Sequence, residues 1–272
     1  MKKIFALALL ITVLNISNMF AQPKRQLTAV LGAFPPEIEL IQEQMENKKV
    51  STIQQINFIE GTLRGRHIVL VNTGIGKVNA AITTTLVLDH FKPDEVIFTG
   101  IAGGVNPALS PGDLVIGSKV AYHDYGAITP DSMRRQPTKT HDNKGSNPMY
   151  FTSDAALVKL AEGVSKHITF KNIGSATNHA PKVVTGVIVT GDVFVSSNTA
   201  TQQLRDKMNA EATEMEGAAV AQTCYQQKVP FLVIRSLSDN ANNTAHNDVA
   251  SFYKVAAFNS ATLVMEIVSN LK

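Results

Sequence analysis

Short apolar runs alternate with stretches of helical periodicity along most of the chain. Runs dense in Val, Ile and Leu predict strands at residues 27–34, 95–100, 113–124, 182–194 and 229–236. The stretch "INFIEGTLRGRHIVLVNTG" predicts a hairpin. Apolar positions with helical spacing predict helices at residues 36–47, 78–91, 153–167 and 251–271, and one more within "ATEMEGAAVAQTCYQQK".

The order of these elements indicates the fold class. Strands that alternate with helices favour an α/β fold with a largely parallel sheet covered on both faces. The chain has 272 residues, 44% of them hydrophobic, which suits one large α/β domain or two small ones. It shows no internal repeat and no clear linker. Local signals set two helix starts, since Pro36 suits a first turn and Ser153 suits an N-cap.

The first 21 residues, "MKKIFALALLITVLNISNMFA", have the pattern of a signal peptide. Two lysines precede an apolar run from Ile4 to about Leu14, which is too short to span a bilayer. We therefore expect cleavage after Ala21, an exported protein (periplasmic or secreted), and a folded domain over residues 22–272 without stable membrane insertion. The alternative is an uncleaved membrane anchor.

Charge and cysteine content narrow the possible partners. The formal net charge is only +3 and the cations are scattered, so nothing favours nucleic acid. The single cysteine, Cys224, has helical surroundings and fits a buried apolar position better than a nucleophile. The seven histidines lack metal-ligand spacing, so we expect no metal site. The sequence "GIGK" lacks the glycine spacing and the Ser or Thr of a phosphate-binding loop.

One segment is unlike the rest of the chain. Residues 124–150 are rich in Pro, Asn, Lys and Ser and poor in aliphatic residues. A loop of this length inside a compact domain is usually functional or mobile. We expect it to act as a lid over a binding site.

Polar and aromatic residues follow the predicted strands. Ligands of an open parallel sheet bind beyond the carboxyl ends of its strands. The residues expected at these ends are Glu37, Gly100, His123, Asp124, Asp192, Phe194, Arg235 and Asp239, with Glu214 and Glu216 at a helix start.

Each of these residues also has a structural interpretation. Glu37 and Glu216 lie where a carboxylate complements a helix dipole, and Arg235 could simply pair with Asp239. Together, however, three carboxylates, an arginine and an aromatic ring suit cleavage of an N-glycosidic bond. That reaction needs a proton for the departing base, stabilisation of an oxocarbenium-like sugar and a nucleophile on the opposite face.

Several segments carry a family resemblance, among them "LGAFPPEIELI", "NTGIGKVNAA", "FTGIAGG", "VTGDVFV", "TEMEGAAVAQTC" and "VPFLVIRSLSDNA". In their order and spacing the chain resembles the nucleoside phosphorylase superfamily, and within it the 5′-methylthioadenosine/S-adenosylhomocysteine nucleosidases. The resemblance extends from about Leu27 to the C-terminus. It implies one α/β domain with a twisted mixed central sheet flanked by helices, no metal or organic cofactor, and a homodimer.

The resemblance also implies two catalytic residues. Asp239 in "RSLSD" matches the general acid that protonates the purine at N7. Glu37 in "GAFPPE" matches the carboxylate that positions the attacking water. A general acid of this kind needs a pKa raised by partial burial.

The remaining matches are implied substrate contacts. Glu216 matches the residue that binds the ribose hydroxyls, and Met215 packs on the sugar beside Glu214. Arg235 matches an arginine near the ribose and the water. Phe194 matches the aromatic that stacks on the base, and the backbone of Val195 reads the purine edge.

Ile101 departs from the family pattern, because the nucleosidases usually carry a small hydroxyl residue at this position near the sugar. An isoleucine here removes one polar contact to the ribose or the water, so the resemblance does not define which nucleoside is the substrate. Residues 124–150 should decide which groups are accepted at the 5′ side of the sugar. Methylthioadenosine recycling is normally cytoplasmic, so an exported chain fits a salvage nucleosidase better.

The residues around Glu37 bear on the choice of nucleophile. Pro35 and Pro36 precede it and Pro36 offers no N–H, while the carboxylate would repel phosphate. The sequence therefore favours hydrolysis of an adenine nucleoside. Two alternatives stay open: a purine- or uridine-type nucleoside phosphorylase, and a nucleoside-binding protein without turnover.

Overall fold

The computed structural model describes residues 26–130, 133–173 and 180–272, so the predicted signal peptide lies outside the described residues. Within them an 11-stranded mixed sheet runs through the molecule in the order β10-β7-β11-β12-β6-β13-β5-β1-β4-β3-β2. Its strands are β1 Leu27–Gly32, β2 Glu46–Ile53, β3 Ile56–Leu63, β4 Arg66–Asn72, β5 Glu95–Phe98, β6 Ile101–Gly104, β7 Leu114–Tyr122, β10 Phe151–Thr152, β11 Val183–Thr190, β12 Ala210–Glu214 and β13 Phe231–Asp239. A separate small ladder pairs β8 Gly126–Ile128 with β9 Met133–Arg135.

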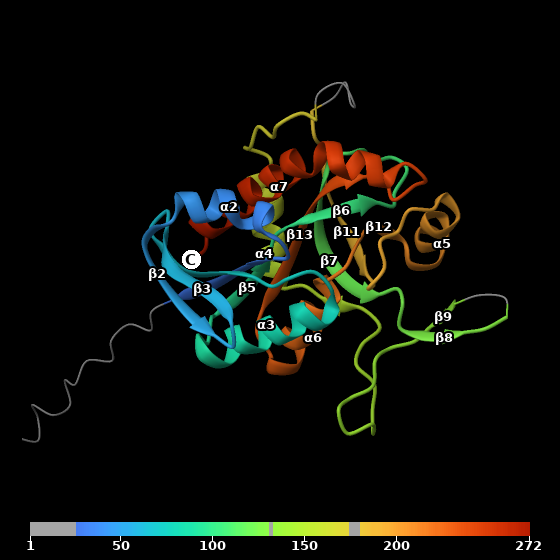
Figure 1. The fold of residues 1–272 in the computed structure, drawn as a ribbon, viewed down its shortest axis with the longest axis horizontal. Helices are drawn as coiled ribbons and strands as arrows, with labels where there is room; N and C mark the ends of the chain where they lie inside the picture. The colour runs from blue at the N-terminus through green and yellow to red at the C-terminus, as the bar shows by residue number, and fades with distance from the viewer. Residues whose placement is uncertain (1–25, 131–132, 174–179) are drawn as a thin grey trace, which may run out of the picture.

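Helices cover both faces of the sheet. They are α2 Pro35–Gln44, α3 Lys77–His90, α4 Ala155–Ser165, α5 Asn198–Met208, α6 Gly217–Gln227 and α7 Ala245–Ser269. Figure 1 shows α2 and α7 on one side of the sheet and α3 and α6 on the other. Two buried apolar clusters fill the two interfaces, one containing α2 and α7 side chains and the other α3 and α6 side chains. The predicted α/β fold with a mixed central sheet is confirmed.

The structure corrects several predicted boundaries. The first helix ends at Gln44 because the chain turns back at Met45 into β2, which the sequence analysis missed together with β6 and α5. Asp154, not Ser153, caps α4, since its carboxylate accepts hydrogen bonds from the N–H groups of Ala156 and Leu157. Ser153 instead donates to the carbonyl of Gly117. The predicted hairpin is confirmed as β3 and β4.

The last strand is longer than its apolar run. β13 continues through Arg235 to Asp239, and all its residues are buried. It pairs with β5, then with β6, and its middle also pairs with β7, so polar side chains here lie inside the protein. The parallel strands β1, β5 and β13 direct their carboxyl ends to one edge of the sheet, where the predicted site residues gather.

The predicted lid is partly structured. β8 and β9 project from the body of the molecule in Figure 1. Gln136 donates to the carbonyl of Tyr125, and Arg135 donates to the carbonyl of His123, so the base of this segment is tied to the end of β7. Whether it closes over a ligand stays a prediction.

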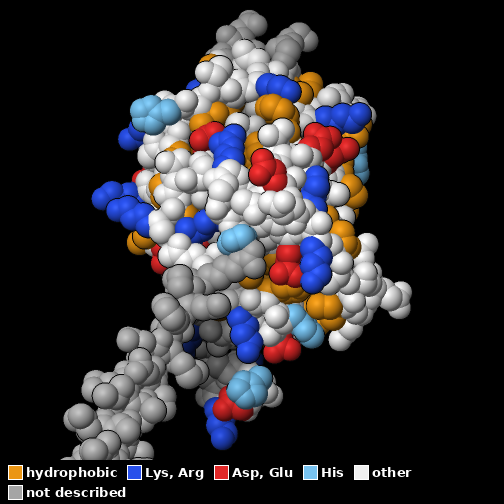
Figure 2. Space-filling model, turned by 90° about the vertical axis from the view of Figure 1, so that its left-hand side faces the viewer, with side chains coloured by type: hydrophobic (Ala, Val, Ile, Leu, Met, Phe, Trp, Pro, Cys, Tyr) orange, Lys and Arg blue, Asp and Glu red, His pale blue; other side chains and the backbone are white. Residues whose placement is uncertain are grey.

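Surface charges are mixed in sign. Figure 2 shows acidic and basic side chains interspersed over one face of the molecule. None of the helices in the described part of the chain is both long enough and apolar enough to cross a bilayer.

Candidate active site

A cavity of about 510 Å³ opens at the carboxyl edge of the sheet. It brings together seven of the nine residues predicted for the site: Glu37, Ile101, Phe194, Glu214, Met215, Glu216 and Asp239. These residues come from α2, β6, β12, β13 and the segments that follow β11 and β12. Segments far apart in the sequence therefore meet in one place, as the strand-end rule predicts.

Glu37 is buried in the first turn of α2 at one end of the cavity. One carboxylate oxygen accepts a hydrogen bond from the N–H of Ile101 at 2.8 Å, and the other accepts from Ala33 at 2.5 Å. Burial raises the pKa of Glu37, and the nearby guanidinium of Arg235 and the backbone donors oppose that rise. The carboxylate also accepts from the N–H of Phe34, the N-cap of α2, at 3.4 Å, so Glu37 both supports the start of this helix and lines the cavity.

Asp239 is only 2% exposed and lies at the end of β13. Its Oδ1 accepts from the N–H of Ala241 at 2.7 Å, and its Oδ2 lies 2.8 Å from the hydroxyl of Ser238. Burial raises the pKa of Asp239, which favours the protonated acid. It makes no ion pair with Arg235, so the salt-bridge interpretation of these two residues is wrong.

Glu214 and Glu216 differ in what holds them. Both oxygens of Glu214 are occupied, by the hydroxyl of Thr190 and by Arg235 and two backbone N–H groups. Glu216 accepts one bond, from Gly76 at 2.8 Å. Burial and the neighbouring Glu214 raise the pKa of Glu216 to about 8. Glu216 thus keeps hydrogen-bonding capacity for a ligand, whereas Glu214 organises the cavity wall.

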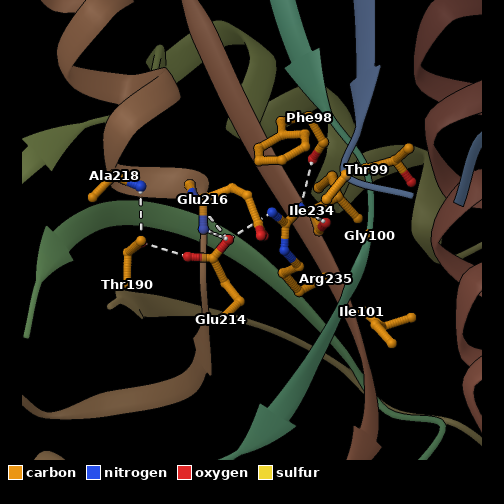
Figure 3. Close-up of polar contacts among 12 residues, drawn as sticks. Phe98, Thr99, Gly100, Ile101, Thr190, Glu214, Glu216, Ala218, Ile234 and Arg235 are labelled. Carbon is orange, nitrogen blue, oxygen red and sulfur yellow. Dashed lines mark hydrogen bonds and ion pairs between the residues drawn. The ribbon is translucent and has the colours of Figure 1, made fainter. Parts of the chain in front are cut away.

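Arg235 lies behind the cavity wall and is 1% exposed. Its Nη2 donates to Glu214 at 2.7 Å, and its Nη1 donates to the carbonyls of Ile234 and Phe98 (Figure 3). The guanidinium also packs over the ring of Phe98, 4.1 Å from its centroid. Arg235 therefore lies behind the residues predicted to contact the substrate, and not among them. Its charge is paired with that of Glu214.

Phe194 and Val195 form the end of the cavity nearest Asp239. Phe194 is 43% exposed, and one of its faces stacks on His246 with ring centroids 4.5 Å apart. Val195 lines a recess of about 30 Å³ that adjoins the cavity and shares Phe194, Met215 and Asp239 with it. A planar base can fit between these apolar groups and the acid.

Another part of the cavity lining is largely apolar. Phe34, Val249 and Tyr253 line it, and the rings of Phe34 and Tyr253 lie 6.3 Å apart. Ile101 adds its side chain to the wall while its backbone N–H holds Glu37. No Lys or Arg belongs to the lining among the described residues.

Three polar residues near strand ends form a cluster beside the cavity. Lys77 lies 2.7 Å from the carboxylate of Asp124, and the backbone N–H of Lys77 donates to Asp192. Asp192 in turn donates its backbone N–H to Asp124. These contacts join the start of α3 to the ends of β7 and β11, so this cluster positions the loops around the site.

Other cavity residues escaped the sequence analysis. Thr213, Ser238 and Tyr253 line the cavity, yet strand alternation and helical spacing treat them as ordinary buried positions. Only Ser238 had a signal, its position directly before Asp239. Cys224 is fully buried and burial raises the pKa of its thiol, so it is unsuited to nucleophilic attack. In the described part of the chain, no three His, Cys, Asp or Glu side chains are grouped to hold a metal ion.

The fold and the cavity define an α/β enzyme of the nucleoside phosphorylase type, with carboxyl groups at the carboxyl edge of a mixed sheet. The sequence profile of the phosphorylase superfamily matches residues 28–269. The chain belongs to this superfamily, as its motifs predict.

Named relatives are more specific. The chain is 38% identical to the 5′-methylthioadenosine/S-adenosylhomocysteine nucleosidase of Bacillus cereus strain G9842, over 90% of this chain and 99% of the relative. The nucleosidase of Neisseria meningitidis in complex with methylthio-immucillin-A is 37% identical and has a TM-score of 0.76, covering 90% of this chain and all of that one. The futalosine hydrolase of Helicobacter pylori is 27% identical with a TM-score of 0.74, covering 91% and 99%.

Proposed function

We propose that the protein is an N-glycosyl hydrolase that cleaves adenine nucleosides, such as 5′-methylthioadenosine or S-adenosylhomocysteine, into adenine and the free sugar. The observation that carries this proposal is one cavity holding two buried carboxyl groups, Asp239 and Glu37, with no described cation in its lining. Relatives named 5′-methylthioadenosine/S-adenosylhomocysteine nucleosidase are 37–38% identical over 90% of the chain, which supports the predicted activity.

The two carboxyl groups have complementary tasks. Asp239, whose pKa is raised by burial, donates its proton to N7 of the purine as the bond between C1′ and N9 breaks. Glu37 holds a water on the other face of the sugar. The water oxygen forms the new bond to C1′ and one of its protons passes to the carboxylate of Glu37, while the electrons of the broken bond leave with the base. Proton transfer of this kind contributes about 10²–10⁴-fold to the rate.

The other site residues support the sugar and the base. Glu216 has free acceptor capacity and serves the ribose hydroxyls, with Met215 against the sugar. Phe194 stacks on the base, and the backbone of Val195 lies beside its edge. Arg235 acts through Glu214, which it holds in place, and not by direct contact with the ligand.

The cavity lining supports water over phosphate as nucleophile. Phosphate would enter a cavity lined by four acidic residues and, among the described lining residues, by no Lys or Arg. Arg235, which lies behind the lining, is already paired with Glu214 at 2.7 Å. Asp239 and Glu216 favour their protonated forms, so the carboxylate of Glu37 is the charge that would repel a dianion at close range.

The apolar part of the cavity lining supports a nucleoside with an apolar 5′ substituent. Phe34, Val249 and the ring of Tyr253 would surround a thioether, and the phenol of Tyr253 is the one polar group that these three side chains would offer to a bare 5′-hydroxyl. The nucleosidase of Neisseria meningitidis was solved with a methylthio compound. One similar structure is named a futalosine hydrolase, so futalosine is also included among the nucleosides to be tested.

The decisive experiment incubates residues 22–272 with methylthioadenosine, S-adenosylhomocysteine, adenosine and futalosine, with and without inorganic phosphate. Chromatography should detect free adenine at the same rate in both conditions. A rate that depends on phosphate, with a sugar 1-phosphate product, would establish the phosphorylase alternative. Ligand-induced thermal stabilisation without any released base would establish the binding-protein alternative.

We infer that the functional unit is a homodimer. Exposed apolar side chains Ile75, Val78 and Ile82 lie at the start of α3, and Val193 is exposed beside them. The contacts of Lys77 with Asp124 and Asp192 hold these two segments together, so the exposed apolar side chains lie around one charged cluster. A matching surface on a second copy would cover these side chains. Light scattering should give twice the chain mass, and Val78→Lys should give the monomer mass.

We also propose that the protein is exported, on the signal-peptide pattern of residues 1–21. The full chain expressed in its natural cells should lose these residues and appear outside the cytoplasm. Mass spectrometry of the mature N-terminus and cell fractionation test this. An intact N-terminus in the cytoplasmic fraction would refute it.

A further inference from the structure

Three residues on neighbouring strands form the floor of the cavity near Asp239. In the sheet register, Thr213 of β12 pairs with Gly103 of β6, and Gly103 pairs with Asp239 of β13. Paired residues direct their side chains to the same face of a sheet. A Cβ atom placed on Gly103 would lie 2.9 Å from Oδ1 of Asp239 and 2.9 Å from Cβ of Ala241, so both residues reach over the glycine. Gly103 thus lies between an acid on one neighbouring strand and a threonine on the other.

Thr213 is a buried polar residue with an unused hydroxyl. The residue is 6% exposed, and it lines both the main cavity and the adjoining recess. Among the described residues its hydroxyl has no hydrogen-bond partner. Other buried threonines are bonded, such as Thr84 to the carbonyl of Ala80 at 2.7 Å and Thr190 to Glu214. A buried unpaired hydroxyl is unfavourable, and a ligand that bonds to it recovers that free energy.

We propose that Thr213 is a specificity-determining residue whose hydroxyl hydrogen-bonds the purine base. The base lies in the part of the cavity that Gly103, Thr213 and Asp239 line together. Two strand spacings, about 9.6 Å, separate the backbones of Thr213 and Asp239, which leaves room for a flat ring between their side chains. The hydroxyl oxygen is buried in the present rotamer, and a rotation about χ1 on ligand binding would turn it toward the cavity. This inference rests on the proposed function and adds a base contact to it.

The chemistry suits a ring nitrogen as partner. Purines carry unprotonated ring nitrogens that accept hydrogen bonds, and the threonine hydroxyl can donate one. The bond forms with the base itself, so it should act on free adenine as well as on the nucleoside. It should change KM and leave kcat nearly unchanged, since the contact is equal in ground and transition states.

The test compares Thr213→Val, which removes only the hydroxyl, with Thr213→Ser, which keeps it. Calorimetry should show that Thr213→Val binds adenine about three- to tenfold more weakly than wild type, and that Thr213→Ser stays close to wild type. The ligand-free Thr213→Val protein should be at least as heat-stable as wild type, because an unpaired hydroxyl has been removed. The matched control Thr84→Val should lose stability without losing adenine affinity, because its hydroxyl is bonded away from the cavity.

Analogues of the base identify the acceptor. Either 1-deazaadenine or 3-deazaadenine should bind wild type as weakly as Thr213→Val binds adenine. Thr213→Val should then bind that analogue no more weakly than it binds adenine. Unchanged adenine affinity in Thr213→Val, in a wild-type enzyme that releases adenine, would overturn this inference and leave the proposed function intact. A wild-type protein that neither binds adenine nor cleaves any purine nucleoside would overturn both.

Discussion

Replacing Asp239 by asparagine tests the proposed mechanism most directly. Asparagine has nearly the same shape, and its side-chain oxygen can still accept from the N–H of Ala241, the 2.7 Å bond of the native acid. Its amide can donate to the hydroxyl of Ser238, which lies 2.8 Å from the native carboxyl. The fold and the cavity should therefore persist, and only the transferable proton is lost.

The expected effect is a fall in kcat of about 10²–10⁴-fold on methylthioadenosine, the range for one general-acid step. KM should change little, because both oxygens of Asp239 are already engaged by the protein. The pKa of Asp239 is raised on folding, so its contribution to stability is complete below its unfolded pKa and is lost as pH rises through the folded value. The variant should thus gain heat stability relative to wild type at neutral pH, and less at pH 4.

A substrate with a better leaving group separates proton donation from positioning. The leaving group of a 4-nitrophenyl riboside is 4-nitrophenolate, which departs without being protonated. Asp239→Asn should therefore hydrolyse this substrate at close to the wild-type rate. Asp206→Asn, on the exposed side of α5, serves as the matched control and should match wild type on both substrates. If Asp239→Asn kept more than about a tenth of kcat on methylthioadenosine, the general-acid role would be wrong, because one such step contributes at least about 10²-fold.

Three further predictions follow from the same geometry. Glu37→Gln should lower kcat on both substrates, since water attack is needed whatever the leaving group; recovery on the nitrophenyl riboside would contradict the assigned role. Glu216→Gln should gain heat stability over wild type progressively from pH 5 to pH 8, because the raised pKa of about 8 makes wild-type stability fall over that window; a constant difference across pH would refute the shift. Ile101→Ser should raise kcat/KM on methylthioadenosine about two- to tenfold by adding one hydrogen bond near the sugar, and steady-state kinetics showing no change would remove Ile101 from the sugar subsite.

The local chain chemistry was enough to predict much of the fold. The hairpin of β3 and β4, α3 and the buried strand β13 follow from periodicity and turn residues, which act over a few positions. Short elements were missed, because β6 and β12 span only four and five residues and contain Gly, Ala and Glu. Their strand conformation depends on pairing with β13 and β11, which no local pattern encodes.

The same division holds for the site. The sequence by itself determined which residue types were available, because motifs such as "EMEG" and "RSLSD" place acids where strands end. Only the tertiary structure decided what each one can do. Glu214 neutralises Arg235 and Glu216 keeps a free acceptor, although they are two positions apart. Thr213 meets Asp239 across Gly103 because three strands distant in sequence pair in register. Burial and hydrogen bonding depend on such long-range contacts, and they set which carboxyl holds a proton.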